Sequence, residues 1–348
     1  MTEPPSTELP STELPSTELP STEPPSMELP GTGLPSYRDL PLAPHGGRCG
    51  WGLFGAGDNL GLVNLMTPER IAAAARLVRR GQVFCLDMPL GSISPALATF
   101  RGPPRHRVLH QPGTTGFDDV YDNFYPQASS QWDSLAHVGY APDQMYNGAT
   151  EAEVLAGTRN TIDHWARHGL VGRAVLLDAE RAIRAAGRPY DPGEAVALGV
   201  DDLELARRRA GVEFMPGDVI LLHTGFAAWY VRQPREVKHR LHGNVVSPGI
   251  EHTEAVCEYL WDSHAAAIAT DNYGVEVFPD DRSPAAYPFG FLHHVLIGLF
   301  GLALGELWWL ADLARDCAAD GVYEMFLVSA PLNAPGGIGS PANAVAIK

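Results

Sequence analysis

The segment VILLH at residues 219–223 is an uninterrupted apolar run that ends on a polar residue. Similar apolar runs occur at residues 83–88, 174–178, 266–270 and 325–328. Short runs of this kind, bounded by polar or turn-forming residues, predict β-strands. Because several of them are apolar at every position, we expect a sheet that other elements cover on both faces.

Helical segments are expected around these strands. Thr67 provides an N-cap, Pro68 suits the first helical position and Glu69 adds an early acid. These signals predict a helix through residues 71–78, which Gly81 ends. Further helices are predicted at residues 201–210, 253–263 and 307–320. The pattern predicts the α/β class, as a single domain of mixed sheets with flanking helices.

The N-terminus carries a repeated pentapeptide. STELP occurs at residues 6–10, 11–15 and 16–20, and the variants STEPP and SMELP follow at residues 21–25 and 26–30. Proline removes backbone donors from every unit, and one apolar side chain per unit cannot offset the entropy of ordering. We therefore predict a disordered tail over residues 1–37, followed by one folded domain over residues 38–348.

Composition excludes several classes of partner. Of the 348 residues, 45% are hydrophobic, which is enough for a full core, and the formal net charge is −16. A surface this acidic repels phosphate backbones and anionic lipid, so neither nucleic acid nor a membrane is an expected partner. There is no signal-peptide pattern and no apolar run long enough to span a membrane. The four cysteines lie far apart without a CxxC pair, which predicts reduced thiols and a cytoplasmic location.

A first polar cluster consists of Gln127, Gln131, Asp133 and His137. In an extended segment, alternate residues through Asp133 share one face, and in a helix the residues four apart are neighbours. Either geometry gives a compact cluster. An ordinary polar loop is the alternative, but Trp132 within the segment indicates partial burial, and buried polar groups need partners or a ligand.

A second cluster follows far along the chain, at His293, His294 and Glu306. On a straight helix, Glu306 would lie about 140° from His293 and about 120° from His294, so neither pair would share a face. A turn is therefore required, and intervening glycines at positions 298, 301 and 305 permit one. The histidines alone could be capping or surface residues. Glu306, however, closes an apolar stretch, and burying an unpaired carboxylate costs several kcal/mol.

Several longer motifs carry a family resemblance. They are GDNLGLVNLMTPERI from residue 57, GLVGRAVLLD at 169–178, PGDVILLHTG at 216–225, DNYGVEVFP at 271–279 and PLNAPGGIGSPANAVAI at 331–347. With these motifs the sequence resembles the cyclase family of metal-dependent hydrolases, which contains kynurenine formamidase, isatin hydrolase and trans-dienelactone hydrolase. The resemblance implies the swivelling β/β/α fold of that family.

The first polar cluster departs from one branch of this family. The formamidase branch has the metal motif His-x-Gly-Thr-His-x-Asp-x-x-x-His. This chain keeps Asp133 and His137 in that register, but Gln127 and Gln131 occupy the two leading histidine positions. The resulting Gln-x-x-x-Gln-x-Asp pattern resembles the branch that holds the dienelactone hydrolase.

The resemblance implies one divalent metal ion. The implied ligands are the carboxylates of Asp133 and Glu306 and the imidazole of His293, with His294 as the alternative histidine. The amides of Gln127 and Gln131 are implied either as further ligands or as neighbours of the ligands. His137 is implied as the general base or acid beside the metal. Because amide oxygens are harder ligands than imidazole, both Zn²⁺ and Mn²⁺ are candidates.

The implied reaction follows from such an ion. A bound dication polarises a carbonyl oxygen and brings the pKa of water to about 7. We therefore predict a hydrolase that opens an amide, a cyclic amide or a lactone with metal-activated water, while His137 transfers a proton. A metal-dependent cyclase or lyase of secondary metabolism and a catalytically inactive binding homologue are the alternatives. The expected partners are a small-molecule substrate and, by the resemblance, further copies in a homodimer or homotetramer.

Other residues are assigned less specific roles. Arg101, Arg105 and Arg107 form a basic segment that could steer a carboxylate substrate or simply be a solvated loop. His223 is interpreted as a satisfied core histidine. Glu276 matches a family position and could lie near the site. The glycine-rich stretch at residues 336–341 is expected to form a tight loop near the pocket.

Overall fold

The computed structural model describes residues 33–348, and the predicted tail lies outside the described residues up to position 32. Tyr37, the last residue of the predicted tail, is packed against the domain. Tyr37 is buried, its backbone N–H donates to Asp262 Oδ1 at 2.7 Å and its hydroxyl donates to Glu254 Oε1 at 2.8 Å. The division into tail and domain otherwise stays a prediction.

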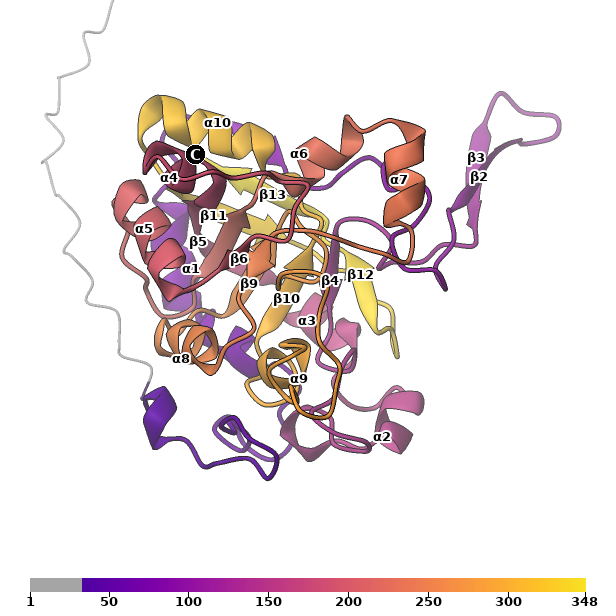
Figure 1. The fold of residues 1–348 in the computed structure, drawn as a ribbon. Helices are drawn as coiled ribbons and strands as arrows, with labels where there is room; N and C mark the ends of the chain where they lie inside the picture. Colours follow the sequence, from indigo (N-terminus) through magenta and orange to yellow (C-terminus); the bar gives the residue numbers. More distant parts are fainter. Residues whose placement is uncertain (1–32) are drawn as a thin grey trace, which may run out of the picture. The chain divides into compact units, whose positions relative to one another are not determined.

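A nine-stranded mixed sheet forms the centre of the fold (Figure 1). In spatial order its strands are β1 (Val83–Cys85), β13 (Ala344–Ile347), β11 (Glu324–Ser329), β5 (Leu170–Asp178), β7 (Val219–His223), β9 (Ala267–Thr270), β10 (Ala303–Glu306), β4 (Gln131–Asp133) and β12 (Gly339–Pro341). The central strands β5, β7, β9 and β10 are parallel, and the outer pairings are antiparallel. Every residue of β7, β9 and β10 is buried, which confirms the expectation of a sheet covered on both faces.

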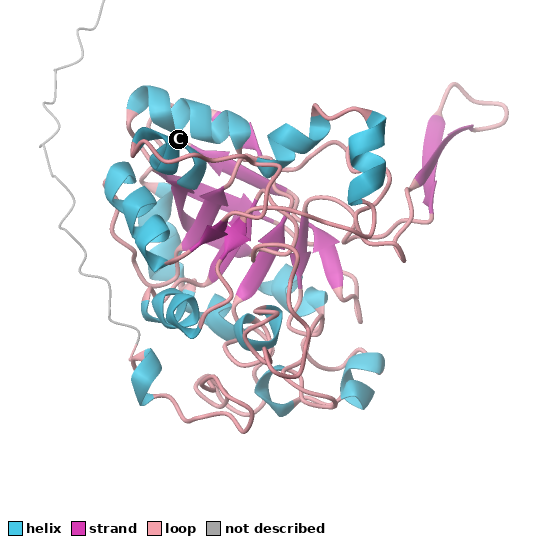
Figure 2. Ribbon diagram, viewed as in Figure 1, coloured by secondary structure: helices cyan, strands magenta, loops and turns pink. Residues whose placement is uncertain are grey.

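Helices surround this sheet (Figure 2). They are α1 (Pro68–Ala75), α2 (Glu151–Leu155), α3 (Ile162–His168), α4 (Ala179–Ala185), α5 (Val200–Ala210), α6 (Phe226–Val231), α7 (Arg235–Leu241), α8 (Glu254–Asp262), α9 (His293–Leu296) and α10 (Ala311–Asp320). Short 3₁₀ helices are η1 (Tyr37–Asp39), η2 (Gly61–Leu65) and η3 (Tyr146–Gly148). Both α1 and α5 pack against β5, which confirms the predicted α/β class.

Two small sheets complete the fold. One pairs β6 (Ala197–Leu198) with β8 (Gly249–Ile250), and the other pairs β2 (Arg105–His110) with β3 (Phe117–Asp122). Among the described residues, no helix has the length and apolar composition that crossing a membrane requires. All four cysteines are free thiols.

The strands and helices that were predicted coincide with observed elements, with differences at their ends. The run at residues 219–223 coincides with β7, whereas the strand predicted over 83–88 ends at Cys85. The helix predicted from residue 307 begins only at Ala311, because Leu307 has a positive φ of 56° and its backbone N–H donates to Asn272. The segment of β4 was left open between an extended and a helical conformation, and β10 was not predicted, because polar residues and Gly305 interrupt the apolar pattern in these strands.

His223 is a satisfied core histidine, as predicted. It ends β7, its Nδ1 lies 3.0 Å from Asp178 Oδ1 and its Nε2 lies 3.8 Å from Asp271 Oδ2. The Asp271 carboxylate also accepts hydrogen bonds from the backbone of Thr224 and Gly225. Burial lowers the pKa of His223, but the charge of Asp271 and the hydrogen bond to Asp178 outweigh it and raise the pKa to about 9. A protonated His223 therefore ties together the ends of β5, β7 and β9.

This linkage predicts a loss of stability at high pH. Because the pKa of His223 is raised above the unfolded value of about 6.5, its contribution is complete below pH ~6.5 and is lost as the pH rises through about 9. The free energy of unfolding in urea should fall across this interval by on the order of 3 kcal/mol at most. The variant His223→Gln should be less stable at pH 6.5 and should show a shallower pH dependence. Parallel pH profiles for the two proteins would contradict this assignment.

Candidate metal centre

The pairing of β4 with β10 builds one wall of the site. In this antiparallel pair, Gln131 lies opposite Glu306 and Asp133 lies opposite Leu304. Directly opposed residues share a face of a sheet, as do residues two apart on one strand. The side chains of Gln131, Asp133 and Glu306 therefore belong to one face, and the extended interpretation of this segment is confirmed over the helical one.

Asp133 is the most enclosed member of the cluster. Its carboxylate is buried and accepts hydrogen bonds from Gln131 Nε2 at 3.2 and 3.1 Å and from the Gln127 amide. The other amide atom of Gln131, Oε1, is buried and has no hydrogen-bond partner. A buried oxygen without a partner next to a carboxylate is an arrangement that a cation would satisfy.

The glycine-rich stretch was expected to form a tight loop near the pocket; it does lie beside this carboxylate, but its residues Gly339–Pro341 form strand β12. Gly339 on β12 is directly opposite Asp133. A Cβ atom at Gly339 would lie 2.5 Å from Gln127 Cγ, so only glycine leaves room for the Gln127 side chain. This glycine therefore admits the amide that contacts both Asp133 and His137.

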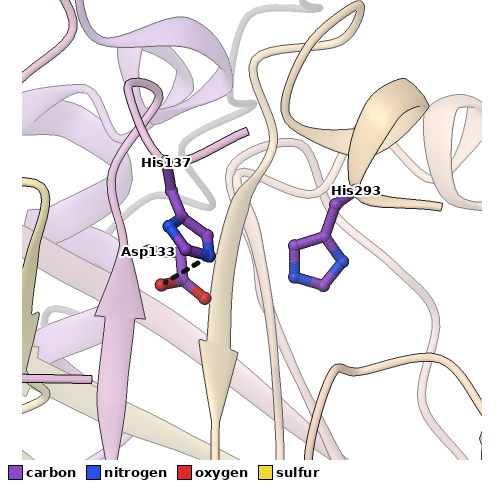
Figure 3. A group of neighbouring side chains, drawn as sticks. All are labelled: Asp133, His137 and His293. Atoms are coloured by element: carbon purple, nitrogen blue, oxygen red, sulfur yellow. Dashed lines mark ion pairs between the residues drawn. The ribbon is translucent and has the colours of Figure 1, made fainter. Parts of the chain in front are cut away.

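His137 completes the first cluster. Its Nδ1 lies 3.0 Å from Gln127 Nε2, which is a donor, so Nδ1 accepts and the proton of the neutral ring is on Nε2. Nε2 lies 3.7 Å from Asp133 Oδ1 (Figure 3). Burial lowers the pKa of His137 despite the charge of Asp133. The imidazole is therefore neutral around pH 7.

His293 reaches the same place from α9 (Figure 3). Its Nδ1 lies 2.9 Å from Glu276 Oε1, and its Nε2 lies 3.2 Å from Glu306 Oε1. Burial lowers the pKa of His293, but the charges and hydrogen bonds of Glu276 and Glu306 outweigh it and raise the pKa to about 10. Burial and the charge of Asp133 raise the pKa of Glu306. Without a cation, His293 is thus an imidazolium held between two carboxylates.

The turn between His293 and Glu306 was required by the sequence and is present. The chain leaves α9, and Gly301 adopts a positive φ of 69° before β10 begins. A side chain there would collide with the Tyr146 ring, since a Cβ atom would lie 2.4 Å from it. The turn brings Glu306 back to the His293 ring.

Six of the seven predicted site residues lie in this network, and His294 does not. Its Nδ1 lies 2.8 Å from the carbonyl oxygen of Gly139, and its ring packs against Tyr287. Among residues 33–348, the one group of three side chains found with metal-ligating atoms all within 4.8 Å of one another is Asp133, His137 and His293. The geometry therefore favours His293 over His294 and adds His137 to the potential ligands. Glu276, which was expected near the site, contacts His293 directly.

Two residues beside the site had no signal in the sequence analysis. The Phe291 ring stacks on the His293 ring at 4.4 Å with an interplanar angle of 6°, and the Arg282 guanidinium lies 4.0 Å from the centre of the Phe291 ring. Phe291 is two residues before His293, so an aromatic residue next to tandem histidines was the available clue. Of the three arginines in the predicted basic segment, Arg101 donates to the Gln127 carbonyl beside the site.

The two adjacent histidines allow a matched test of cation binding. Replacing His293 with Ala removes a potential ligand, so Mn²⁺ or Zn²⁺ affinity should fall by a factor of ~10–100 or more. His294→Ala should stay within about threefold of the wild type, because His294 faces Gly139. Equilibrium dialysis with elemental analysis measures both, and circular dichroism checks the fold. Equal losses of affinity in the two variants would contradict the geometric assignment.

Comparison with known proteins identifies the family of this chain. The family model described as "Putative cyclase" matches residues 86–277. A crystal structure of a novel cyclase is 32% identical, with a TM-score of 0.74, covering 86% of this chain and 99% of that chain. Isatin hydrolase A from Ralstonia solanacearum is 19% identical, with a TM-score of 0.56, covering 81% and 98% of the two chains. Isatin hydrolase A from Labrenzia aggregata bound to benzyl benzoate is 16% identical, with a TM-score of 0.51, covering 78% and 94%. A search among curated proteins found no match. The family match and the 32% identity show that this chain belongs to the cyclase family.

Proposed function

We propose that this protein is a metal-dependent hydrolase that opens an amide, a cyclic amide or a lactone. The observation that carries the proposal is the grouping of Asp133, His137 and His293, next to a glutamine, Gln131, whose buried amide oxygen lacks a partner. The proteins with a similar fold that are isatin hydrolases support the hydrolytic direction. One ion of Zn²⁺ or Mn²⁺ fits a set of this size and chemistry.

The residues of the cluster would have different roles in holding the cation. Asp133 and His293 would hold the cation, with Glu306 and the Gln131 oxygen next to it. Glu276 would orient His293, because its carboxylate accepts the Nδ1 proton and turns Nε2 toward the ion. When bound, the cation supplies the polarisation of a carbonyl oxygen and a water with a pKa of about 7.

We assign proton transfer to His137. Its side chain is 22% exposed, whereas those of Asp133, His293 and Glu306 are 0%, 2% and 5% exposed. His137 is thus the member of the cluster that a substrate can reach. Gln127 contacts Nδ1, so Nε2 is the ring nitrogen that faces Asp133. His137 would take up the proton that the attacking water loses and would pass a proton to the leaving nitrogen or oxygen, so that the ring is neutral before and after the reaction.

Two arginines beside the site favour a substrate that carries a negative charge. Arg101 lies against Gln127, and Arg282 lies over Phe291, so one guanidinium stands close to each half of the cluster. Such charges attract an anionic substrate in a protein whose net charge is −16. We therefore include a carboxylate or another anionic group in the proposed substrate class. Arg105 and Arg107 belong to the hairpin β2–β3, where Arg107 pairs with Asp122 at 2.9 Å.

Removal of the metal should abolish turnover of a panel of aryl formamides, cyclic amides and lactones. Chelator-treated protein should regain activity with Mn²⁺ or Zn²⁺, and Asp133→Asn should lower kcat/KM by a factor of ~10³ or more. Asp201→Asn, at an exposed position on α5, is the control and should match the wild type. Turnover by the metal-free protein would refute the proposal.

Labelled water separates the proposed reaction from its alternatives. Hydrolysis in H₂¹⁸O should place one ¹⁸O atom in the carboxylate product. A product without ¹⁸O would instead indicate ring closure or elimination. The inactive alternative has an observation in its favour, because both glutamine amides donate to Asp133 in place of histidine ligands. A protein that neither retains metal through purification nor turns over any compound would support it.

Measurements of kcat and of bound metal should distinguish the role of His137 from that of His293. His137→Ala should lower kcat by a factor of ~10²–10⁴ while retaining most of the bound metal, because it removes a proton donor. His293→Ala should lose the metal together with the activity. If His137→Ala also releases the metal, His137 is a ligand and the assignment of proton transfer is wrong.

A further inference from the structure

A separate cavity of about 560 Å³ lies at the carboxyl ends of two central parallel strands, β5 and β7. The last residues of these strands, Asp178 and His223, line it, and α4 and α10 supply its walls (Figure 1). Its lining residues are all different from those of the candidate metal centre. Ligands of open α/β sheets bind outside the carboxyl ends of the strands, and a cavity of this volume suits a small molecule.

The lining of this cavity is basic. Its titratable residues come from α4, α10 and the two strand ends, and they are Arg181, Arg184, Arg315, His223, Asp178 and Glu180. With His223 protonated, four of these six groups are cations and two are carboxylates. A concentration of positive charge in a chain whose net charge is −16 attracts anions to this one place.

The three arginines keep donors available for a ligand. Arg181 donates to Asp178 through Nε at 3.1 Å, and Arg184 contacts Glu180 through Nε and Nη2 at 3.2 Å. Arg315 contacts a carboxylate of its own helix through Nη1 at 2.9 Å. A guanidinium has five N–H donors, so each arginine has further donors beyond these contacts. The three side chains are at least half exposed and can turn toward a ligand in the cavity.

His223 adds a buried donor to the same cavity. The residue is only 7% exposed, and its Nδ1 lies 3.0 Å from Asp178 Oδ1. Its Nε2 is 3.8 Å from Asp271 Oδ2, which is an ion pair but longer than a hydrogen bond. Burial lowers the pKa of His223, but Asp271 and Asp178 raise it to about 9, so both ring nitrogens carry a proton at neutral pH. The Nε2–H can therefore donate to a ligand oxygen.

This set of donors favours a tetrahedral dianion. The donors come from α4, α10 and β7, so a ligand that contacts all of them needs oxygens that point in several directions. A phosphate monoester has three such acceptor oxygens and a charge close to −2 at pH ~7, whereas a carboxylate has two oxygens in one plane. This charge would balance the excess of two cations in the lining. The cavity also leaves room for an organic group beyond the phosphate.

We propose that this cavity binds a phosphate group, either as inorganic phosphate or as the monoester of a small molecule. The guanidinium groups of Arg181, Arg184 and Arg315 would hold its outer oxygens, and His223 would donate from the floor of the cavity. The proposal does not depend on the proposed catalytic function.

Isothermal titration calorimetry of the full chain tests the proposal at constant ionic strength, with inorganic phosphate and phenyl phosphate as the probes. Arg184→Ala and Arg315→Ala should each weaken binding by ~10–100-fold, because each removes charge-assisted hydrogen bonds. Arg208→Ala is the matched control and should bind like the wild type. Arg208 is also an exposed helical arginine, paired with Glu204 four residues earlier at 3.3 Å, but it lies outside the cavity. Circular dichroism should show that all three variants are folded.

A further variant separates this cavity from the candidate metal centre, where phosphate could bind a metal ion. Asp133→Asn should leave phosphate binding unchanged. Tighter binding of phenyl phosphate would support a monoester as the ligand, and binding of inorganic phosphate alone would support free phosphate.

Four results would overturn the proposal. The first is a wild type without saturable binding of either probe up to about 10 mM. The second is equal binding by Arg184→Ala and Arg208→Ala, which would make Arg184 an ordinary surface residue. The third is loss of binding in Asp133→Asn together with retention in Arg184→Ala. The fourth is acetate binding as tightly as phosphate.

Discussion

The burial of three carboxylates around one imidazole is the constraint on which the rest of this structure depends. Asp133, Glu276 and Glu306 are all buried, and the latter two share His293 as their cationic partner. Taking such charges out of water is expensive unless opposite charge lies close by. One imidazolium offsets only part of this charge, and the Gln131 oxygen is left without a partner. A divalent cation would offset the remaining negative charge and would give the Gln131 oxygen a partner. The same buried charges that constrain the fold would therefore also create the cation site.

The cluster exists because two short strands pair at the edge of the parallel part of the sheet. β4 and β10 are short, and packing on the opposite face supports their pairing. There Trp132 is buried opposite Gly305, and Trp308 donates its indole N–H to the Gln131 carbonyl. The aromatic residues therefore hold the strand register that sets Gln131 against Glu306. A slip of one residue would turn Asp133 away from the histidines.

The local sequence pattern was sufficient to predict individual strands and helices. The apolar run at residues 219–223 is β7, and the capping signals at Thr67 and Pro68 start α1. The two polar clusters were also visible in the sequence, but the family resemblance, not local pattern, supplied their expected roles at a metal ion. Their arrangement was beyond reach from local pattern. The choice of His293 over His294 depends on which ring meets Glu276, and the stacking of Arg282 and Phe291 depends on a loop conformation. Both are tertiary contacts with no periodic signature.

Gln127 links the candidate site to the projecting hairpin β2–β3 (Figure 1). Gln127 contacts Asp133 and His137 through its amide, while its carbonyl accepts from Arg101 at the other end of the hairpin segment. The amide sits at the base of the hairpin, where both ends of the segment meet. A shift of the segment between Arg101 and Gln127 would therefore displace the amide that contacts both Asp133 and His137.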